Sequence, residues 1–262
     1  MLVLIEHIIL GIIQGLTEFL PISSTGHLVL FRQLFGLQEA GLLFDTMLHF
    51  GTLIAVVIVF WPEILQLLRN PFGKLARLLV VGTIPTAAIG LTFEDFFEEI
   101  SQTGMTIGYE FLATGLIIWA VESMRKGKRS FEQINYTDAL IIGTLQGAAI
   151  LPAISRSGLT IAGALMRGIE RGEAARFSFL LSLPAILGGV VLQTKKLVDG
   201  PVESIALIPM LIGTMFAAIA GYFAIRWMLK IISTGSMKGF AVYVWLLGVV
   251  ILAMQFFGYW QV

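Results

Sequence analysis

The stretch that decides the fold is Gln14-Gly-Leu-Thr-Glu-Phe-Leu-Pro-Ile-Ser-Ser-Thr-Gly-His27. It places a carboxylate, an imidazole, a proline and a run of hydroxyls inside an otherwise apolar segment. An ionisable group inside a bilayer costs on the order of several kcal/mol unless it is paired or hydrated. We therefore expect this stretch to line a functional site.

The composition around this stretch is that of an integral membrane protein. Of the 262 residues, 57% are hydrophobic and 13% are charged, and the mean hydropathy is +0.89. The apolar segments have the helical length of about 20 residues that crosses the hydrocarbon core, which excludes barrel strands of about ten residues. Basic and acidic residues balance at 17 each, so no basic field indicates nucleic acid. We expect a multi-pass, all-α protein of the cell membrane in contact with membrane lipids.

Six apolar segments are predicted to span the membrane: 44–61, 75–91, 106–124, 177–193, 205–224 and 240–257. Two further apolar pieces, 2–34 and 139–166, are each interrupted by a cluster of Pro, Ser and Gly. The arm after each cluster is too short to cross the bilayer. Both pieces are therefore predicted to be re-entrant helix-turn-helix hairpins.

An internal repeat relates the two hairpins. A shift of 132 residues aligns Gly11, Gln14 and Gly15 with Gly143, Gln146 and Gly147, and residues 22–26 with 154–158. With small slips, 44–53 then aligns with 177–186, and Gly82 and Gly90 with Gly213 and Gly221. Each half holds one hairpin and three spans, so the two copies must have opposite orientations. We predict one membrane domain, 1–262, made of inverted repeats of about 1–124 and 138–262 that are joined by a linker at 125–137.

The loop charges predict the orientation. If the loop around Asn70 is cytoplasmic, that side collects most of the basic residues: Arg69, Lys74, Arg77, Arg125, Lys126, Lys128, Arg129, Arg167, Arg171, Arg176, Arg226, Lys230 and Lys238. The opposite side keeps Arg32, Lys195 and Lys196. The positive-inside rule selects this topology. The chain ends and the entrance of the first hairpin then face outward, and the second hairpin enters from the cytoplasm.

Three ionisable residues are expected at membrane depth: Glu18, His27 and Arg156. Gln14 and Glu18 are four apart and share a helix face. The hydroxyls and backbone N–H groups of residues 23–26, and of 155–158 in the other hairpin, suit an anion, and a guanidinium binds phosphate in bidentate fashion.

If the repeat brings the loops together, a phosphate held by Arg156 lies beside Ser24, His27 and Glu18. Such a set supplies a nucleophile, a base or acid, and charge stabilisation for phosphoryl transfer. The alternative is a structural Glu18–Arg156 ion pair with hydroxyls that cap helices.

The chain contains two paired motifs. The first is Gln14-x-x-x-Glu18 with Pro21-x-Ser-Ser-Thr-Gly-His27, and the second is Pro152-x-x-Ser155-Arg156-Ser157-x-x-Thr160. Together they resemble the signatures of the undecaprenyl-diphosphatase family of bacitracin-resistance type. The resemblance covers the whole chain. It implies a membrane phosphatase that removes the terminal phosphate of a polyprenyl diphosphate and recycles the carrier lipid for peptidoglycan and other cell-envelope polymers. It also implies a divalent cation, Mg²⁺ or Ca²⁺.

Carried over residue by residue, the resemblance assigns metal binding to Gln14 and Glu18, nucleophilic attack to Ser24, proton transfer to His27 and phosphate binding to the second loop. With the neighbouring groups, the expected phosphate-binding set is Ser23, Thr25, Gly26, Ser155, Arg156, Ser157 and Thr160. Asp45, His49 and Gln146 are candidates for orienting these residues; for Asp45 and His49, simple interface hydrogen bonds are equally favoured. The chain departs from the family pattern at Gln14, where some members have Glu, and at Ala153, where Gly is usual.

A different class of function is the alternative reading. Inverted repeats with broken helices are also the architecture of transporters, so a transporter or flippase of an anionic lipid or small anion is the rival. The combination of Ser24, His27 and Glu18 facing Arg156 favours catalysis, because a carrier needs no nucleophile. The site is expected to open to the extracytoplasmic side. The sequence leaves open whether the chain forms a homodimer.

Overall fold

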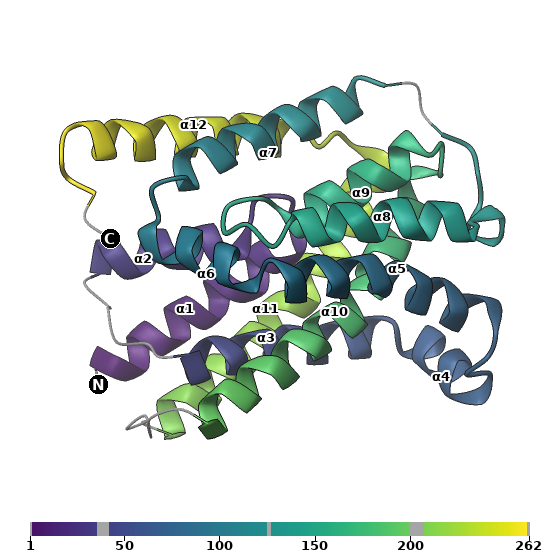
Figure 1. Cartoon of the computed structure of the whole chain (residues 1–262), viewed down its shortest axis with the longest axis horizontal. Helices are drawn as coiled ribbons and strands as arrows, with labels where there is room; N and C mark the ends of the chain where they lie inside the picture. Colours follow the sequence, from purple (N-terminus) through teal and green to yellow (C-terminus); the bar gives the residue numbers. More distant parts are fainter. Residues whose placement is uncertain (1, 36–41, 125–126, 200–206, 261–262) are drawn as a thin grey trace.

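The computed structural model describes residues 2–35, 42–124, 127–199 and 207–260, and its regular secondary structure there is helical (Figure 1). The elements are α1 (Leu2–Phe19), α2 (Ser24–Phe35), α3 (Leu42–Val59), α4 (Trp61–Arg69), α5 (Lys74–Thr92), α6 (Glu94–Thr103), α7 (Ile107–Glu122), η1 (Phe131–Gln133), α8 (Tyr136–Ala148), α9 (Arg156–Met166), α10 (Arg171–Asp199), α11 (Leu207–Thr234) and α12 (Lys238–Phe256). The predicted all-α class is confirmed for these residues.

Five of the predicted spans each fall largely on one helix, whereas 44–61 runs from α3 across a break into the first residue of α4. Helix length alone does not give six spans. Four of the described helices, α5, α10, α11 and α12, are long and apolar enough to cross a membrane. α3 passes the same test only together with α4, from which it is bent by 82°, so that the number rises to five at most. α7 has 16 residues, fewer than the about 20 that span a bilayer unaided. The first two residues of the predicted span 205–224 lie outside the described residues. The multi-pass class is confirmed.

Both apolar pieces that were predicted to be hairpins are broken at their Pro-Ser-Gly clusters. The first break separates α1 from α2, and the second separates α8 from α9. The arms after the breaks are short, 12 residues in α2 and 11 in α9. In Figure 1, the α1–α2 hairpin opens toward the end of the molecule where α1 begins and α12 ends. The α8–α9 hairpin opens toward the opposite end, where α4 lies.

Two glycine crossings hold the hairpins against long helices. α1 packs on α11 and α8 packs on α5. A Cβ atom on Gly11 would lie 2.2 Å from the carbonyl oxygen of Gly213, and one on Gly143 would lie 1.8 Å from that of Gly82. Only glycine allows this approach, as at other close helix crossings in membranes. The glycines that contact each other come from different halves of the chain.

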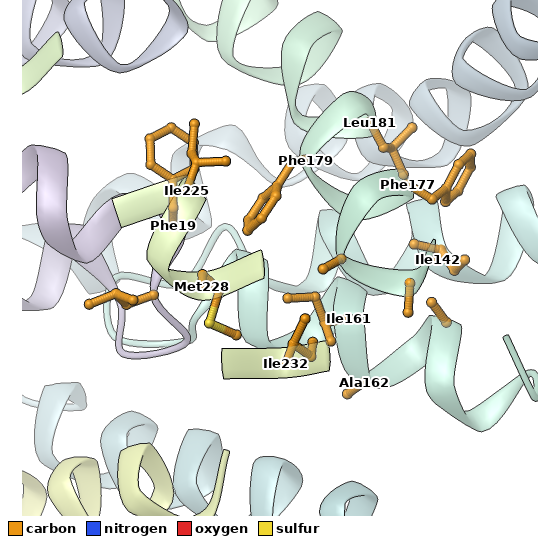
Figure 2. Close-up of a cluster of buried hydrophobic side chains, with 14 of the residues drawn as sticks. Phe19, Ile142, Ile161, Ala162, Phe177, Phe179, Leu181, Ile225, Met228 and Ile232 are labelled. Carbon is orange, nitrogen blue, oxygen red and sulfur yellow. The ribbon is translucent and has the colours of Figure 1, made fainter. Parts of the chain in front are cut away.

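Part of the hydrophobic core lies where α9, α10 and α11 meet the end of α1 (Figure 2). The rings of Phe19 and Phe179 pack edge to face, with centroids 5.7 Å apart. Residues 157–165 of α9 are all buried, the pattern of a helix enclosed on every side. The core therefore anchors both hairpins at the point where each carries its polar residues.

The described part of the predicted linker, 127–137, is tied to the second hairpin. Asp138 is fully buried at the start of α8 and pairs with Arg129 at 2.6 Å and with Arg167 at 2.8 Å. The hydrogen bond and the charge of Asp138 raise the pKa of the Arg129 guanidinium above its ordinary value. This end of the hairpin is thus fixed by paired charges.

Candidate active site

The two helix breaks meet and cross-link each other. Ser23 in the first break donates its hydroxyl to the carbonyl oxygen of Pro152 in the second, at 2.6 Å. In return, Ser157 donates to the carbonyl oxygen of Leu20 at 3.0 Å. These are buried bonds between residues more than a hundred positions apart in the chain. The loops that the sequence placed in separate hairpins therefore form one structure.

Ser23 has a backbone conformation that is uncommon for a residue with a side chain. Its φ of +66° lies in the left-handed region. The conformation is held by the bond to Pro152 and by His27, whose Nδ1 donates to the Ser23 carbonyl oxygen at 2.6 Å. Backbone strain of this kind costs about 1–3 kcal/mol and is concentrated at functional sites. It turns the chain so that Ser24 begins α2 facing the end of α1.

Glu18 is the centre of the polar cluster. Its Oε2 accepts a hydrogen bond from the Ser24 hydroxyl at 2.5 Å and another from the Gln14 amide at 3.0 Å. Its Oε1 is paired with the guanidinium of Arg156 from the other hairpin. The predicted sharing of one helix face by Gln14 and Glu18 is therefore observed as a direct contact. The carboxylate is buried, and its negative charge is balanced by Arg156.

Arg156 has spare hydrogen-bonding capacity. Ser155 caps α9 by accepting from the backbone N–H of Gly158 at 3.1 Å, which places Arg156 as the first residue of that helix. Nη2 of Arg156 is bound to Glu18, whereas Nη1 is buried and has no hydrogen-bond partner. A buried donor left unpaired is costly. An anion placed next to Glu18 and Ser24 would satisfy it.

His27 faces away from this cluster. Because Nδ1 donates to a carbonyl oxygen, the neutral ring has a bare Nε2, which accepts from the hydroxyl of Tyr243 on α12 at 2.8 Å. The His27 ring also stacks on Tyr243 and packs edge to face on Phe111. Both ring nitrogens are therefore engaged outside the Glu18 group. To handle the Ser24 proton, His27 would have to exchange Tyr243 for another partner.

Most of the other predicted phosphate-binding hydroxyls are engaged within the protein. Thr160 is hydrogen-bonded to Ser178 at 2.6 Å and donates to the Arg156 carbonyl oxygen at 2.8 Å. Thr25 is exposed. Gly26 packs so tightly that a Cβ atom there would lie 2.6 Å from the Phe111 ring. Together with the bonds of Ser23, Ser155 and Ser157, these contacts build the loops around Arg156.

The three candidate orienting residues take different positions. His49 accepts from the Gln14 amide at 2.8 Å, and its Nδ1 lies 3.8 Å from Glu18 Oε2, so it does belong to the cluster. Asp45 instead forms a bidentate pair with Arg32. Gln146 donates to Thr86 at 3.2 Å and to the carbonyl oxygen of Leu181 at 3.4 Å. Asp45 and Gln146 therefore form hydrogen bonds to residues of neighbouring helices, and neither is hydrogen-bonded to Glu18.

The donor set around Gln14 suits a hard cation. Within the described ranges, no three His, Cys, Asp or Glu side chains converge as metal ligands. However, Oε1 of Gln14 is buried without a hydrogen-bond partner, beside the Glu18 carboxylate. Carbonyl and carboxylate oxygens are the ligands of Mg²⁺ and Ca²⁺, and Mg²⁺ commonly takes its remaining ligands from phosphate and water. The residues present therefore fit a cation shared with a phosphate.

Two groups next to the site were not predicted from the sequence. Tyr243 carried no signal, because an aromatic residue in an apolar span is common. Glu110, on α7, is 6% exposed and contacts the second loop. Glu110 could have been found from the sequence, because it is an acidic residue inside the predicted span 106–124 and such residues commonly mark functional groups in membranes.

The fold and the site define a class: a helical membrane protein in which two helix breaks join a hydroxyl, a carboxylate and a guanidinium in one buried cluster. Residues 7–250 match the family described as bacitracin resistance protein BacA. The chain is 56% identical over 252 residues to undecaprenyl-diphosphatase 4 of Bacillus cereus, covering 96% of this chain and 97% of that one. It is 51% identical to the undecaprenyl-diphosphatase of Carboxydothermus hydrogenoformans, covering 95% and 97%, and 44% identical to that of Halothermothrix orenii, covering 94% and 96%. This protein belongs to the BacA family.

Proposed function

We infer that this protein is an undecaprenyl-diphosphatase, a membrane hydrolase that removes the terminal phosphate of undecaprenyl diphosphate and so recycles the lipid carrier of cell-envelope synthesis. The names and the near-complete coverage of its relatives support this function. The observation that carries it in this chain is the contact of Ser24 with Glu18 beside Arg156, whose Nη1 lacks a partner. A transporter needs no such nucleophile, and none of the relatives quoted above is named as one.

The reaction we propose begins at Ser24. Its oxygen forms a bond to the terminal phosphorus as the anhydride bond breaks, and undecaprenyl phosphate leaves. Glu18 accepts the Ser24 proton, because its Oε2 already receives that hydrogen bond. Arg156 stabilises the charge on the phosphoryl oxygens through Nη1. Water then hydrolyses the phosphoserine and releases phosphate. Attack by water or by His27 is the alternative to attack by serine.

A divalent cation, Mg²⁺ or Ca²⁺, would be held by Glu18 and Gln14. When bound, it supplies positive charge that offsets the charge of the diphosphate. The amide nitrogen of Gln14 is held by His49 and by Glu18, which leaves its amide oxygen without a hydrogen-bond partner and available to the cation.

We propose six spans and two re-entrant hairpins in an inverted repeat, with the site open to the extracytoplasmic side. The opposite directions of the two hairpins in Figure 1 support this arrangement. So do the reciprocal crossings of Gly11 with Gly213 and of Gly143 with Gly82, since a two-fold relation exchanges one crossing for the other. That the protein forms a homodimer stays a prediction. Light scattering of the purified protein tests it by measuring the mass of the particle.

The test is phosphate release from undecaprenyl diphosphate by the purified protein, with and without divalent metal. Glu18→Ala and Arg156→Ala should each abolish release. Glu99→Ala and Arg77→Ala remove the same charges at exposed positions and should leave it unchanged. Full activity in Glu18→Ala and Arg156→Ala would show that the site is elsewhere.

A further inference from the structure

Helix α7 carries a buried acid for which the proposed reaction has no use. Both carboxylate oxygens of Glu110 accept hydrogen bonds, one from the backbone N–H of Ala153 at 2.5 Å and the other from the hydroxyl of Thr106 at 2.6 Å. In the part of the chain that the structure describes, no Lys, Arg or His forms an ion pair with Glu110. An intramembrane carboxylate is expensive without a cationic partner. Of the two donors that hold Glu110, Thr106 precedes α7 on the same segment, whereas Ala153 belongs to the loop before Arg156, so the long-range contact of Glu110 is with that loop.

Thr114, one helical turn further along α7, binds the same loop. Its hydroxyl donates to the carbonyl oxygen of Ala153 at 3.0 Å and accepts from the backbone N–H of Ser155 at 3.2 Å. Glu110 and Thr114 together therefore engage three backbone groups of the segment 153–155. Thr114 is 3% exposed and Ala153 is fully buried, so water does not replace these bonds.

The bound segment leads directly into Arg156. Ser155 is the N-cap of α9 and Arg156 is the first residue of that helix. On the other side of the loop, Ser23 binds the carbonyl oxygen of Pro152. The loop is thus held between the first hairpin and α7. A change on the α7 side shifts the start of α9, and with it the guanidinium.

We propose that Glu110 and Thr114 form a brace that sets the position of the Arg156 loop for the terminal phosphate of the substrate. They are positioning residues that act through the backbone of 153–155. What the brace requires of residue 110 is a hydrogen-bond acceptor for Ala153, and it does not require a negative charge. The inference rests on the proposed diphosphatase function, because that function supplies the phosphate that the loop would bind.

Two substitutions of Glu110 test whether a hydrogen-bond acceptor is what this position requires. Glu110→Gln keeps an oxygen for Ala153, and its amide can donate to the Thr106 hydroxyl. Glu110→Leu fills a similar volume but leaves the Ala153 N–H unpaired, and Thr114→Val does the same to Ser155. We expect Glu110→Leu and Thr114→Val to raise the KM for undecaprenyl diphosphate about ten- to a hundredfold, the range for an unpaired buried donor. Glu110→Gln should stay within about threefold of the wild type.

A second buried carboxylate on α7 is the matched control. Glu122 pairs with Arg171 at 3.0 Å at the other end of the helix. Glu122→Gln should lower the melting temperature while leaving KM unchanged. An unchanged KM in Glu110→Leu would overturn the brace, as would equal damage by Glu110→Gln and Glu110→Leu.

A binding measurement makes the inference independent of turnover. Inorganic pyrophosphate should raise the melting temperature of the wild type and of Glu110→Gln, and should raise that of Glu110→Leu only at about ten- to a hundredfold higher concentration. If the wild type binds pyrophosphate in this way but releases no phosphate from the lipid, the proposed function fails and the brace stands. If Glu110→Leu responds like the wild type, the brace fails. If the wild type shows no response, the loop binds no phosphate and the inference fails with it.

Discussion

The hydroxyl of Ser24 lies 2.5 Å from Oε2 of Glu18, across the break between α1 and α2. The other oxygen of the same carboxylate is paired with Arg156. One buried carboxylate thus connects the Ser24 hydroxyl of the first hairpin to the Arg156 guanidinium of the second. The sequence motifs assign metal binding to Glu18 and proton transfer to His27. The geometry gives Glu18 the more direct relation to the Ser24 proton.

Ser24→Ala should lower kcat for phosphate release by at least about a thousandfold, because the attacking oxygen is removed. Glu18→Gln should cost about a hundred- to ten-thousandfold through loss of the base. The measurement is single-turnover phosphate release from undecaprenyl diphosphate. Ser233→Ala, an exposed hydroxyl on α11, is the control. Near-normal release by Ser24→Ala would exclude the covalent serine and favour attack by water or by His27.

Gln14→Glu should lower the concentration of Mg²⁺ or Ca²⁺ needed for half-maximal activity by about tenfold, because an added carboxylate raises the charge of the metal site. Gln14→Ala should raise it. Thermal stabilisation by the metal, measured without substrate, should follow the same order. Identical metal dependence in the three proteins would remove Gln14 from the metal site.

Single cysteines can map the orientation, because the chain has none of its own. A membrane-impermeant maleimide should label Thr25→Cys and Tyr259→Cys in intact cells, since both residues are exposed and both are predicted to face outward. Phe72→Cys, an exposed position in the loop around Asn70 that is predicted to be cytoplasmic, should react only after permeabilisation. Labelling of Thr25→Cys only in permeabilised cells would mean that the site opens inward.

Gly143→Ala should destabilise the protein by about 1–3 kcal/mol, because the added methyl group has no room against Gly82. Gly188→Ala is the matched control: it also lies within a helix, and no atom lies within 4 Å of the position that its methyl group would take. It should stabilise the helix by about 0.5–1 kcal/mol. Thermal unfolding in detergent compares the two. Equal stability of both variants would contradict a tight α5–α8 crossing.

Much of the architecture could be predicted because it follows from local chemistry. The apolar segments had to be helices, since a backbone in lipid must satisfy its own hydrogen bonds. Both breaks could be placed because Pro21 and Pro152 end helical patterns. The number of spans was harder: α7 is short and α3 continues into α4 through an 82° bend, and neither feature alters the apolar pattern.

The site was predictable in its members and less so in its contacts. Gln14 and Glu18 were named from their spacing, and Ser24 and Arg156 from the polar breaks that the repeat relates. All four meet at the Glu18 carboxylate. The partners of His27, Asp45 and Gln146 were not foreseen, because Tyr243, Arg32 and Thr86 come from elements that no short motif connects to them.

By itself, the sequence determined that the chain is a multi-pass helical protein with two broken segments and a repeated motif, because hydropathy, proline and charge act over a few residues. Only the tertiary structure decided which polar groups touch. The distance between Glu18 and Arg156, and the hold of Glu110 on Ala153, depend on the packing of helices far apart in the chain. A buried carboxylate is stable only where a counter-charge or hydrogen-bond donors reach it, so the fold that brings these groups together also forms the candidate site.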